Sequence, residues 1–328
     1  MSQLSGARRR VASVEALVTT ETPVNGHSLP LLVRPAAADV ALAGWIAANR
    51  EQPRQWLDRH GAVLFRGFGI ADAAGLAALL RATGAEPLDY TERSSPRREL
   101  GGRVYTSTEH PAHAEIPLHC ENSYQTAWPG LLMFLCRVPA VTGGETPLAD
   151  TRRIRARLPP DLVDRFRAHG VMYRRCLDGR LGLSWQEVLG TTDRTEAERR
   201  CVARGLRFAW RADGALRTEA VRPLVDRHPR TGEPIWFNHT LFFHPSTLDP
   251  EARAALAGLP SEDLPNDTRF GDGSAVPDEA VAALRDAYQR EDVRFTWEAG
   301  DVLLLDNMLA AHGRAAFTGR REVLVAMG

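Results

Sequence analysis

Short apolar runs, separated by polar segments rich in turn residues, recur along the chain. Runs of four to eight residues bounded by turn signals predict strands, which we expect at 62–65, 131–138, 235–238, 293–297, 302–305 and 323–327. Apolar positions repeating every three or four residues predict helices over 38–49, 71–82 and 278–288. Many short strands with a few helices outside them favour a β-sandwich or barrel decorated by helices.

The polar segments between these elements suggest how the chain is organised. Residues 1–28 are polar and without period, which predicts a flexible N-terminal arm before a single domain over 29–328. Residues 90–116 are rich in Ser, Thr, Arg and Pro and predict a long loop over a site. Residues 151–230 are polar and predict a mainly helical insertion into the domain.

Composition narrows the range of functions. Formal net charge is zero, with 41 basic and 41 acidic residues, so no long-range field favours nucleic acid or an anionic membrane as partner. Every basic residue is arginine. A chain without lysine can form no Schiff base, anchor no pyridoxal phosphate and supply no P-loop lysine, which excludes three large enzyme classes.

Cysteine spacing and hydropathy indicate a cytoplasmic protein. Cys120, Cys136, Cys176 and Cys201 are scattered without CxxC pairs, so reduced thiols are expected rather than disulfides or a structural zinc site. No run approaches the ~20 apolar residues that span a bilayer, and no apolar segment follows the N-terminal arginines as in a secretory signal.

The spacing of His119, Glu121 and a distant His312 suggests a metal site. Residues two apart on a strand face the same side, so His119 and Glu121 can aim at one point while Cys120 faces the other way and packs. Two histidines and one carboxylate leave three adjacent positions open on Fe(II). Zinc takes the same ligands, and His-x-Glu is by itself a weak motif.

Four segments together resemble the TauD/TfdA superfamily, and within it the clavaminate-synthase-like and SyrP-like branch. They are HCENSYQTAWP at 119–129, GGETP at 143–147, GDVLLLDN at 300–307 and HGR at 312–314. The resemblance covers roughly residues 60 to 328. It implies an α+β fold with a double-stranded β-helix (jelly roll) core, surrounding helices and a helical insertion. It also implies Fe(II) held by His119, Glu121 and His312, with 2-oxoglutarate and O₂ as co-substrates.

The same resemblance implies residues for the distal carboxylate of 2-oxoglutarate. Thr146 occupies the family's threonine position, and an arginine after the second histidine binds the carboxylate through two charge-assisted hydrogen bonds. We assign Arg321, with Arg320 as the alternative because the local sequence departs from the branch pattern. Arg314 is a candidate either for this pocket or for a surface salt bridge.

The resemblance also implies the chemistry. Oxidative decarboxylation of 2-oxoglutarate gives succinate and CO₂ and is coupled to oxidation of a C–H bond of a substrate beside the metal. Related halogenases replace the carboxylate ligand with a small residue, so retention of Glu121 argues against halogenation. Asp306 and Asn307 are expected to cap a turn and to orient the strand that carries the second histidine.

Only the resemblance to the SyrP-like branch indicates which class of substrate the protein would use. Its SyrP-like members hydroxylate amino acids, some of them tethered to a peptidyl carrier protein. Arg93 and Arg217 are candidates to bind a substrate carboxylate, with Asn122 and Ser123 lining the mouth of the site. Each of these arginines could equally be solvated or paired with an acidic residue.

Three alternatives remain at this stage. One is a hydroxylase, desaturase or cyclase of a free small amino acid. Another is a non-catalytic, metal-binding jelly-roll protein, which the joint presence of Thr146 and Arg321 argues against. The third is a nucleic-acid-acting dioxygenase, which the balanced charge disfavours. The sequence leaves open the carbon oxidised, the stereochemistry and the oligomeric state, including a homo-oligomer.

Overall fold

A computed structural model describes residues 17–21, 29–89, 98–107, 110–248 and 250–328. Its largest sheet is seven-stranded and antiparallel except for one parallel pair, β2 with β3. In spatial order the strands are β1 (Val18–Glu21), β2 (Leu31–Pro35), β3 (Ala62–Phe65), β15 (Val302–Asp306), β6 (Leu131–Val138), β18 (Glu322–Met327) and β4 (Val104–Thr106). The strands expected at 62–65, 131–138, 302–305 and 323–327 are thereby confirmed, and they come from distant parts of the chain.

Both faces of this sheet are buried, which explains the continuous apolar runs. Alternate residues of β3 separate accordingly: Val63 and Phe65 join an apolar cluster with α3, whereas Ala62 and Leu64 join a cluster on the other face. The helices on the first side are α1 (Leu42–Ala48), α2 (Glu51–His60) and α3 (Ala73–Ala82). The helix expected over 38–49 is shorter in the structure, and α2 was not predicted.

Small sheets cover the other face. One is three-stranded, β5 (Ile116–His119), β16 (Ala310–Arg314) and β8 (Leu148–Asp150), and the other pairs β17 (Phe317–Thr318) with β7 (Thr142–Gly143). Leu148 and Ala310 pack in one cluster with the second face of the large sheet. The fold is therefore α+β with layered sheets, as expected, while closure of these sheets into a jelly roll remains a prediction.

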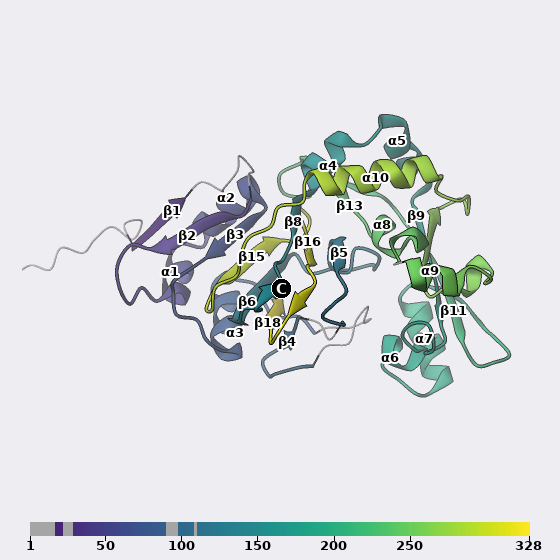
Figure 1. The fold of residues 1–328 in the computed structure, drawn as a ribbon, viewed down its shortest axis with the longest axis horizontal. Coiled ribbons are helices and arrows are strands. Elements are labelled where there is room, and N and C mark those ends of the chain that lie inside the picture. Colours follow the sequence, from purple (N-terminus) through teal and green to yellow (C-terminus); the bar gives the residue numbers. More distant parts are fainter. Residues whose placement is uncertain (1–16, 22–28, 90–97, 108–109, 249) are drawn as a thin grey trace, which may run out of the picture.

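The insertion contains much more strand than predicted. A four-stranded sheet lies apart from the large one (Figure 1), in the order β10 (Arg207–Trp210), β11 (Leu216–Arg222), β9 (Val171–Leu177) and β14 (Asp267–Phe270). A further hairpin joins β12 (Val225–Arg227) to β13 (Pro234–Phe237). Within residues 151–230 the helices still account for more of the chain than the strands do, so the predicted helical insertion is present but contains strands that were not predicted.

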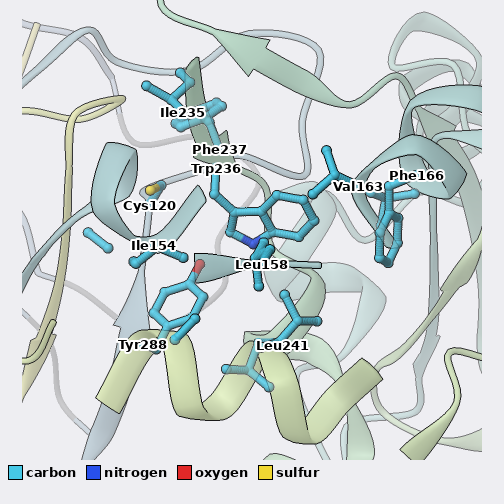
Figure 2. Close-up of a cluster of buried hydrophobic side chains, with 14 of the residues drawn as sticks. Cys120, Ile154, Leu158, Val163, Phe166, Ile235, Trp236, Phe237, Leu241 and Tyr288 are labelled. Carbon is cyan, nitrogen blue, oxygen red and sulfur yellow. The ribbon is translucent and has the colours of Figure 1, made fainter. Parts of the chain in front are cut away.

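Helices frame this second sheet. They are α4 (Thr151–Arg157), α5 (Pro160–His169), α6 (Trp185–Leu189), α7 (Arg194–Ala203), α8 (Thr240–Phe243), α9 (Pro250–Leu256) and α10 (Asp278–Arg290), with 3-10 turns at Pro245–Thr247 and Ser261–Asp263. Trp236 of β13 is fully buried against side chains of α4, α5 and α10 (Figure 2). This cluster attaches the insertion to the turn that follows β5, because Cys120 belongs to it.

One further expectation, a strand at 293–297, was not met by the described residues. The segment 293–297 is not a strand; only Val293 forms a bridge, to Leu148, and its neighbours pack on the core from an extended chain. Within the predicted N-terminal arm, Val18–Glu21 pair with β2. The division into an arm over 1–28 and a domain over 29–328 remains a prediction. Among the described residues, no helix has the length and hydropathy needed to cross a membrane.

Candidate metal centre

His119, Glu121 and His312 converge at the small sheet. His119 ends β5 and is the direct cross-strand partner of His312 in β16. The Nε2 atoms of both histidines lie 3.8 Å from the same carboxylate oxygen of Glu121, and all three donor atoms lie within 4.8 Å of one another. Donors bound at ~2.1 Å to one ion are about 3 Å apart in adjacent positions, so small side-chain movements would complete the site.

The tautomer of His119 suits a metal ligand. Its Nδ1 lies 2.8 Å from the carbonyl oxygen of Pro117, which can only accept a hydrogen bond. Nδ1 therefore carries the ring proton and Nε2 is left as an unprotonated donor for a cation. His312 is buried and packs against the rings of His119 and Phe134, at centroid distances of 4.6 and 5.3 Å.

Glu121 is positioned by a side chain rather than by a strand. The chain leaves β5 after His119 and turns through Asn122, whose φ is +56°. The buried side-chain amide of Asn307 fixes the backbone of Glu121. Its Oδ1 accepts from the Glu121 N–H at 2.8 Å, and its Nδ2 donates to the Glu121 carbonyl at 2.9 Å. His119 and Glu121 do point to one place, as predicted, but not because both lie on one strand. Asn307 orients Glu121 rather than the strand that carries the second histidine.

Cys120 packs on the far side, as expected. It is fully buried, and its sulfur lies among apolar side chains near Ile154 and Trp236 (Figure 2). Burial raises the pKa of this thiol far above its usual range. A neutral thiol in an apolar cluster anchors the turn and does not compete for the metal.

Asp306 caps the turn that leads to His312. One carboxylate oxygen accepts from the backbone N–H groups of Met308 and Leu309 at 2.9 and 3.1 Å. The other lies 3.2 Å from His228 Nε2 and 3.1 Å from Arg230 Nη2. The expected turn cap is confirmed, and through it the turn between β15 and β16 is joined to the insertion.

Thr146 and Arg321, the candidate residues for binding 2-oxoglutarate, lie in or next to the segment that runs beside β16. Residues 145–148 run beside β16, with backbone hydrogen bonds from Gly313 to Pro147 and from Ala315 to Glu145. Thr146 is buried there, and its hydroxyl accepts from the Trp297 indole at 3.1 Å. Arg321 donates to the carbonyl of Gly144 at 2.8 Å.

The other two arginines of this region have different surroundings. Arg320 is exposed, with a side chain 77% accessible, and pairs with Glu322. Arg314 is buried and donates to the backbone carbonyls of His110, Pro111 and Ala114 at 2.5–2.8 Å. Arg314 therefore clamps the loop before β5, a role that neither sequence-based alternative included.

The substrate candidates are dispersed. Asn122 and Ser123 are buried beside Glu121, and the Ser123 hydroxyl donates to the Cys120 carbonyl at 3.1 Å. Arg217 forms an ion pair with Asp263 at 2.6 Å on the four-stranded sheet. Arg93 lies outside the described residues.

His239 is a residue of this centre that the sequence analysis missed. Its ring lies 5.7 Å from that of His119 and 4.9 Å from that of Tyr124. Its Nδ1 lies 3.0 Å from Ser123 Oγ, which has already given its one proton to Cys120, so Nδ1 donates and Nε2 is an acceptor. Burial, and then the nearby His119, hold the pKa of His239 well below its usual value.

The buried Nε2 of His239 has no hydrogen-bond partner among the described residues. A neutral imidazole with a bare acceptor beside the metal ligands can receive a hydrogen bond from a bound molecule. His239 is 118 residues beyond Glu121 along the chain and sits in no motif, so only the three-dimensional arrangement identifies it.

Comparisons with known proteins agree with this geometry. The chain matches the taurine catabolism dioxygenase TauD, TfdA family over residues 27–327. The dapdiamide synthesis protein DdaC of Enterobacter agglomerans is 40% identical over 272 residues, which are 83% of this chain and 83% of that one. A clavaminate synthase-like protein of Arabidopsis thaliana is 30% identical over 337 residues, covering 95% of this chain and 98% of its own.

Solved structures share the fold at low sequence identity. PvcB, an Fe, α-ketoglutarate dependent oxygenase from an isonitrile synthetic pathway, has a TM-score of 0.54 at 18% identity, covering 94% of this chain and 90% of that one. AAD-2 in complex with Mn(II) and N-oxalylglycine has a TM-score of 0.55 at 12% identity, covering 94% and 96%. With the family match and the converging His, Glu and His side chains, the chain belongs to the TauD/TfdA family of Fe(II)- and 2-oxoglutarate-dependent dioxygenases.

Proposed function

We propose that this enzyme hydroxylates an unactivated C–H bond of an amino acid or amino-acid-derived substrate, free or tethered to a peptidyl carrier protein, in secondary metabolism. The observation that carries the proposal is the 40% identity to DdaC, a protein of dapdiamide synthesis. The converging metal ligands of this chain support the same proposal.

Bound Fe(II), with 2-oxoglutarate and O₂, supplies the oxidising power for C–H cleavage. The chain's own part is to hold and orient. His119, Glu121 and His312 would hold the ion through two imidazole nitrogens and one carboxylate oxygen. With two neutral imidazoles and one carboxylate as ligands, a bound Fe(II) would keep a net positive charge that favours an anionic 2-oxo acid.

We assign the distal carboxylate of 2-oxoglutarate to Arg321 and Thr146. Burial, and then the nearby Arg314, lower the pKa of Arg321 to about 10, so at neutral pH a charged guanidinium is buried at some cost. A carboxylate would compensate that charge with two hydrogen bonds. Arg320 is a poor alternative because its exposed side chain already pairs with Glu322.

The substrate would approach on the side of Ser123 and His239. Asn122 and Ser123 follow Glu121 directly and are buried, and His239 offers its Nε2 as an acceptor. We further infer that the seven-stranded and the small sheets are the two halves of a double-stranded β-helix. Cytoplasmic location and a homo-oligomeric state remain predictions.

The first experiment tests the centre itself. Fe(II) and 2-oxoglutarate are titrated without O₂ into metal-free protein, with His312→Ala as control, and the visible spectrum is recorded. We expect a weak metal-to-ligand charge-transfer band in the wild type alone. Bound iron without such a band would contradict the dioxygenase assignment for this chain.

A second candidate function is hydroxylation, desaturation or cyclisation of a free small amino acid, without a carrier protein. Turnover on free and thioester-bound forms of the same amino acid separates the two candidates. Product mass then separates the reactions, since hydroxylation adds one oxygen atom whereas desaturation and cyclisation remove two hydrogens.

A further inference from the structure

A small, partly open cavity of about 30 Å³ lies between the four-stranded sheet and helices α6 and α7. Three arginines line it, and we call them the arginine pocket: Arg175 of β9, Arg204 after α7 and Arg222 at the end of β11. The remaining described lining residues are Tyr124, Tyr173, Thr218 and aliphatic side chains, and they include no aspartate or glutamate.

Arg175 has a buried N–H group to which a ligand in the cavity would supply an acceptor. Its Nε is buried and has no hydrogen-bond partner among the described residues. Its guanidinium lies 5.5 and 5.9 Å from the ring centres of Phe243 and Tyr124. Burying an N–H of a charged group without an acceptor is costly, and an anion in the cavity would remove that cost.

The opposite face of the same sheet shows the contrast. There Arg174 of β9 pairs with Glu219 at 2.7 Å, and Arg217 of β11 pairs with Asp263 at 2.6 Å. Arginines that only stabilise this sheet therefore have carboxylate partners from the chain. Arg175, one residue from Arg174, faces a cavity whose described lining offers none.

The arginine pocket adjoins the metal centre. Arg222 donates to the carbonyl of Tyr124 at 3.2 Å, and Tyr124 follows Glu121 in the same turn. From the Tyr124 ring, the His239 ring is 4.9 Å away, and the His119 ring is 5.7 Å from that of His239. The packed rings of Tyr124 and His239 therefore lie between the arginine pocket and the metal ligands, and a substrate that reaches both would run along these rings.

We propose that the arginine pocket binds a free carboxylate of the substrate, which rests on the proposed function. The cavity has room for one small group, and a guanidinium fork matches a carboxylate in shape and charge. A carrier protein holds an amino acid through a thioester, which consumes its α-carboxylate. The substrate is therefore either a free amino-acid derivative or a tethered one with a second carboxylate.

The test uses acetate, with acetamide as its uncharged counterpart. Wild type, Arg175→Gln and the matched control Arg174→Gln are loaded with Fe(II) and 2-oxoglutarate without O₂, at constant ionic strength. The midpoint of thermal unfolding is followed against probe concentration, because a ligand of the folded state raises it saturably. We expect acetate alone to stabilise wild type and Arg174→Gln, with at least about tenfold weaker binding to Arg175→Gln.

Three outcomes would overturn the proposal: no saturable effect of acetate on wild type, an equal effect on Arg175→Gln, or an equal effect of acetamide. A fourth is tighter Arg175-dependent binding of inorganic phosphate than of acetate, which would assign the pocket to a phosphate group instead. Without any probe, Arg175→Gln should unfold no earlier than wild type, because it removes an uncompensated charge; an earlier midpoint would indicate a merely structural arginine.

The charge-transfer band keeps this result separate from the proposed function. Arg175→Gln should retain the band of the Fe(II) and 2-oxoglutarate complex, since no metal ligand is altered. Loss of acetate binding with a normal band supports the pocket alone. An absent band in wild type contradicts the dioxygenase assignment whatever acetate does.

Discussion

The seven-stranded sheet and the four-stranded sheet differ in where they carry charged side chains. The seven-stranded sheet is apolar on both faces, and its central strand β15 is buried throughout. The four-stranded sheet carries arginines on both faces, paired with carboxylates on one and gathered around a cavity on the other. The first holds the metal ligands in place through packing; the second, by our proposal, recognises charge.

The difference shows how stability and specificity are divided in the chain. Apolar packing makes the large sheet a rigid support for the turn that leads to His312. An arginine held near a cavity without a carboxylate costs stability unless a ligand supplies the charge. A change in the large sheet should therefore affect folding first, and a change in the arginine pocket should affect ligand choice first.

Loss of the carboxylate ligand should have the largest effect. Glu121→Ala is expected to abolish the charge-transfer band and to reduce turnover by well over about 100-fold, because even residues that only orient a ligand contribute 10–100-fold. Arg217→Gln, on the second sheet, should keep the band. A band of normal intensity in Glu121→Ala would show that another side chain holds the metal.

Truncation in the large sheet should mainly affect stability. Leu304→Ala removes a fully buried side chain of β15 and should lower the free energy of unfolding by about 2–5 kcal/mol. Val221→Ala, on the second sheet where the side chain is 41% exposed, should change it by less than about 0.5 kcal/mol. Denaturant unfolding of the two variants measures the contrast, and equal losses would refute it.

Arg321→Met should weaken 2-oxoglutarate binding by about 30-fold or more, the usual consequence of removing one partner of a buried charge pair. The neighbouring variant Arg320→Met, which loses an exposed ion pair, should bind the co-substrate within about twofold of wild type. Anaerobic titration of the band gives both affinities. The reverse ranking would transfer the assignment to Arg320.

The lowered pKa of Arg321 leads to a prediction about how stability depends on pH. Its pKa is lowered to about 10 in the folded protein from 12.5, so the unfolded chain binds this proton more tightly. Without co-substrate, its contribution to stability should rise as pH increases from about 10 towards 12.5. Subtracting the stability of Arg321→Met from that of wild type across this range isolates the contribution, and a flat difference would contradict the burial argument.

Asn307→Ala should weaken the centre without removing a metal ligand. Without the amide, the backbone of Glu121 loses both hydrogen bonds that fix it, and Fe(II) affinity should fall by about 10–100-fold. Unfolding of the metal-free protein would separate this from a general loss of structure. Unchanged iron affinity would mean that the turn through Asn122 suffices by itself.

The same contrast between the sheets explains what could be predicted from the sequence. The strands at 62–65 and 131–138 were found because a strand buried on both faces is a continuous apolar run. β11 reads LRTEAVR and was missed, because its polar side chains are paired across the sheet, as Glu219 is with Arg174 of β9 and Arg207 of β10. At 293–297 the alternation was real, but beyond the single bridge from Val293 to Leu148 the apolar residues pack on the core without pairing to a strand.

The site was predictable where its residues lie in motifs. His119, Glu121 and His312 were found through the family resemblance, although Glu121 comes from a turn held by Asn307 and not from a strand. His239 and Arg175 have no local signature. Each is chemically ordinary in sequence and becomes notable only when folding buries one of its nitrogens without a partner, which depends on packing between distant segments.

The cross-strand pairing of His119 with His312 has a consequence for biosynthesis. The two ligands are separated by 193 positions along the chain, and β18, in the interior of the large sheet, follows both. While a ribosome is still making the segment between them, the nascent chain has His119 and Glu121 but neither the second histidine nor Asn307 to fix the carboxylate. The complete set of three ligands therefore exists only after His312 has been synthesised.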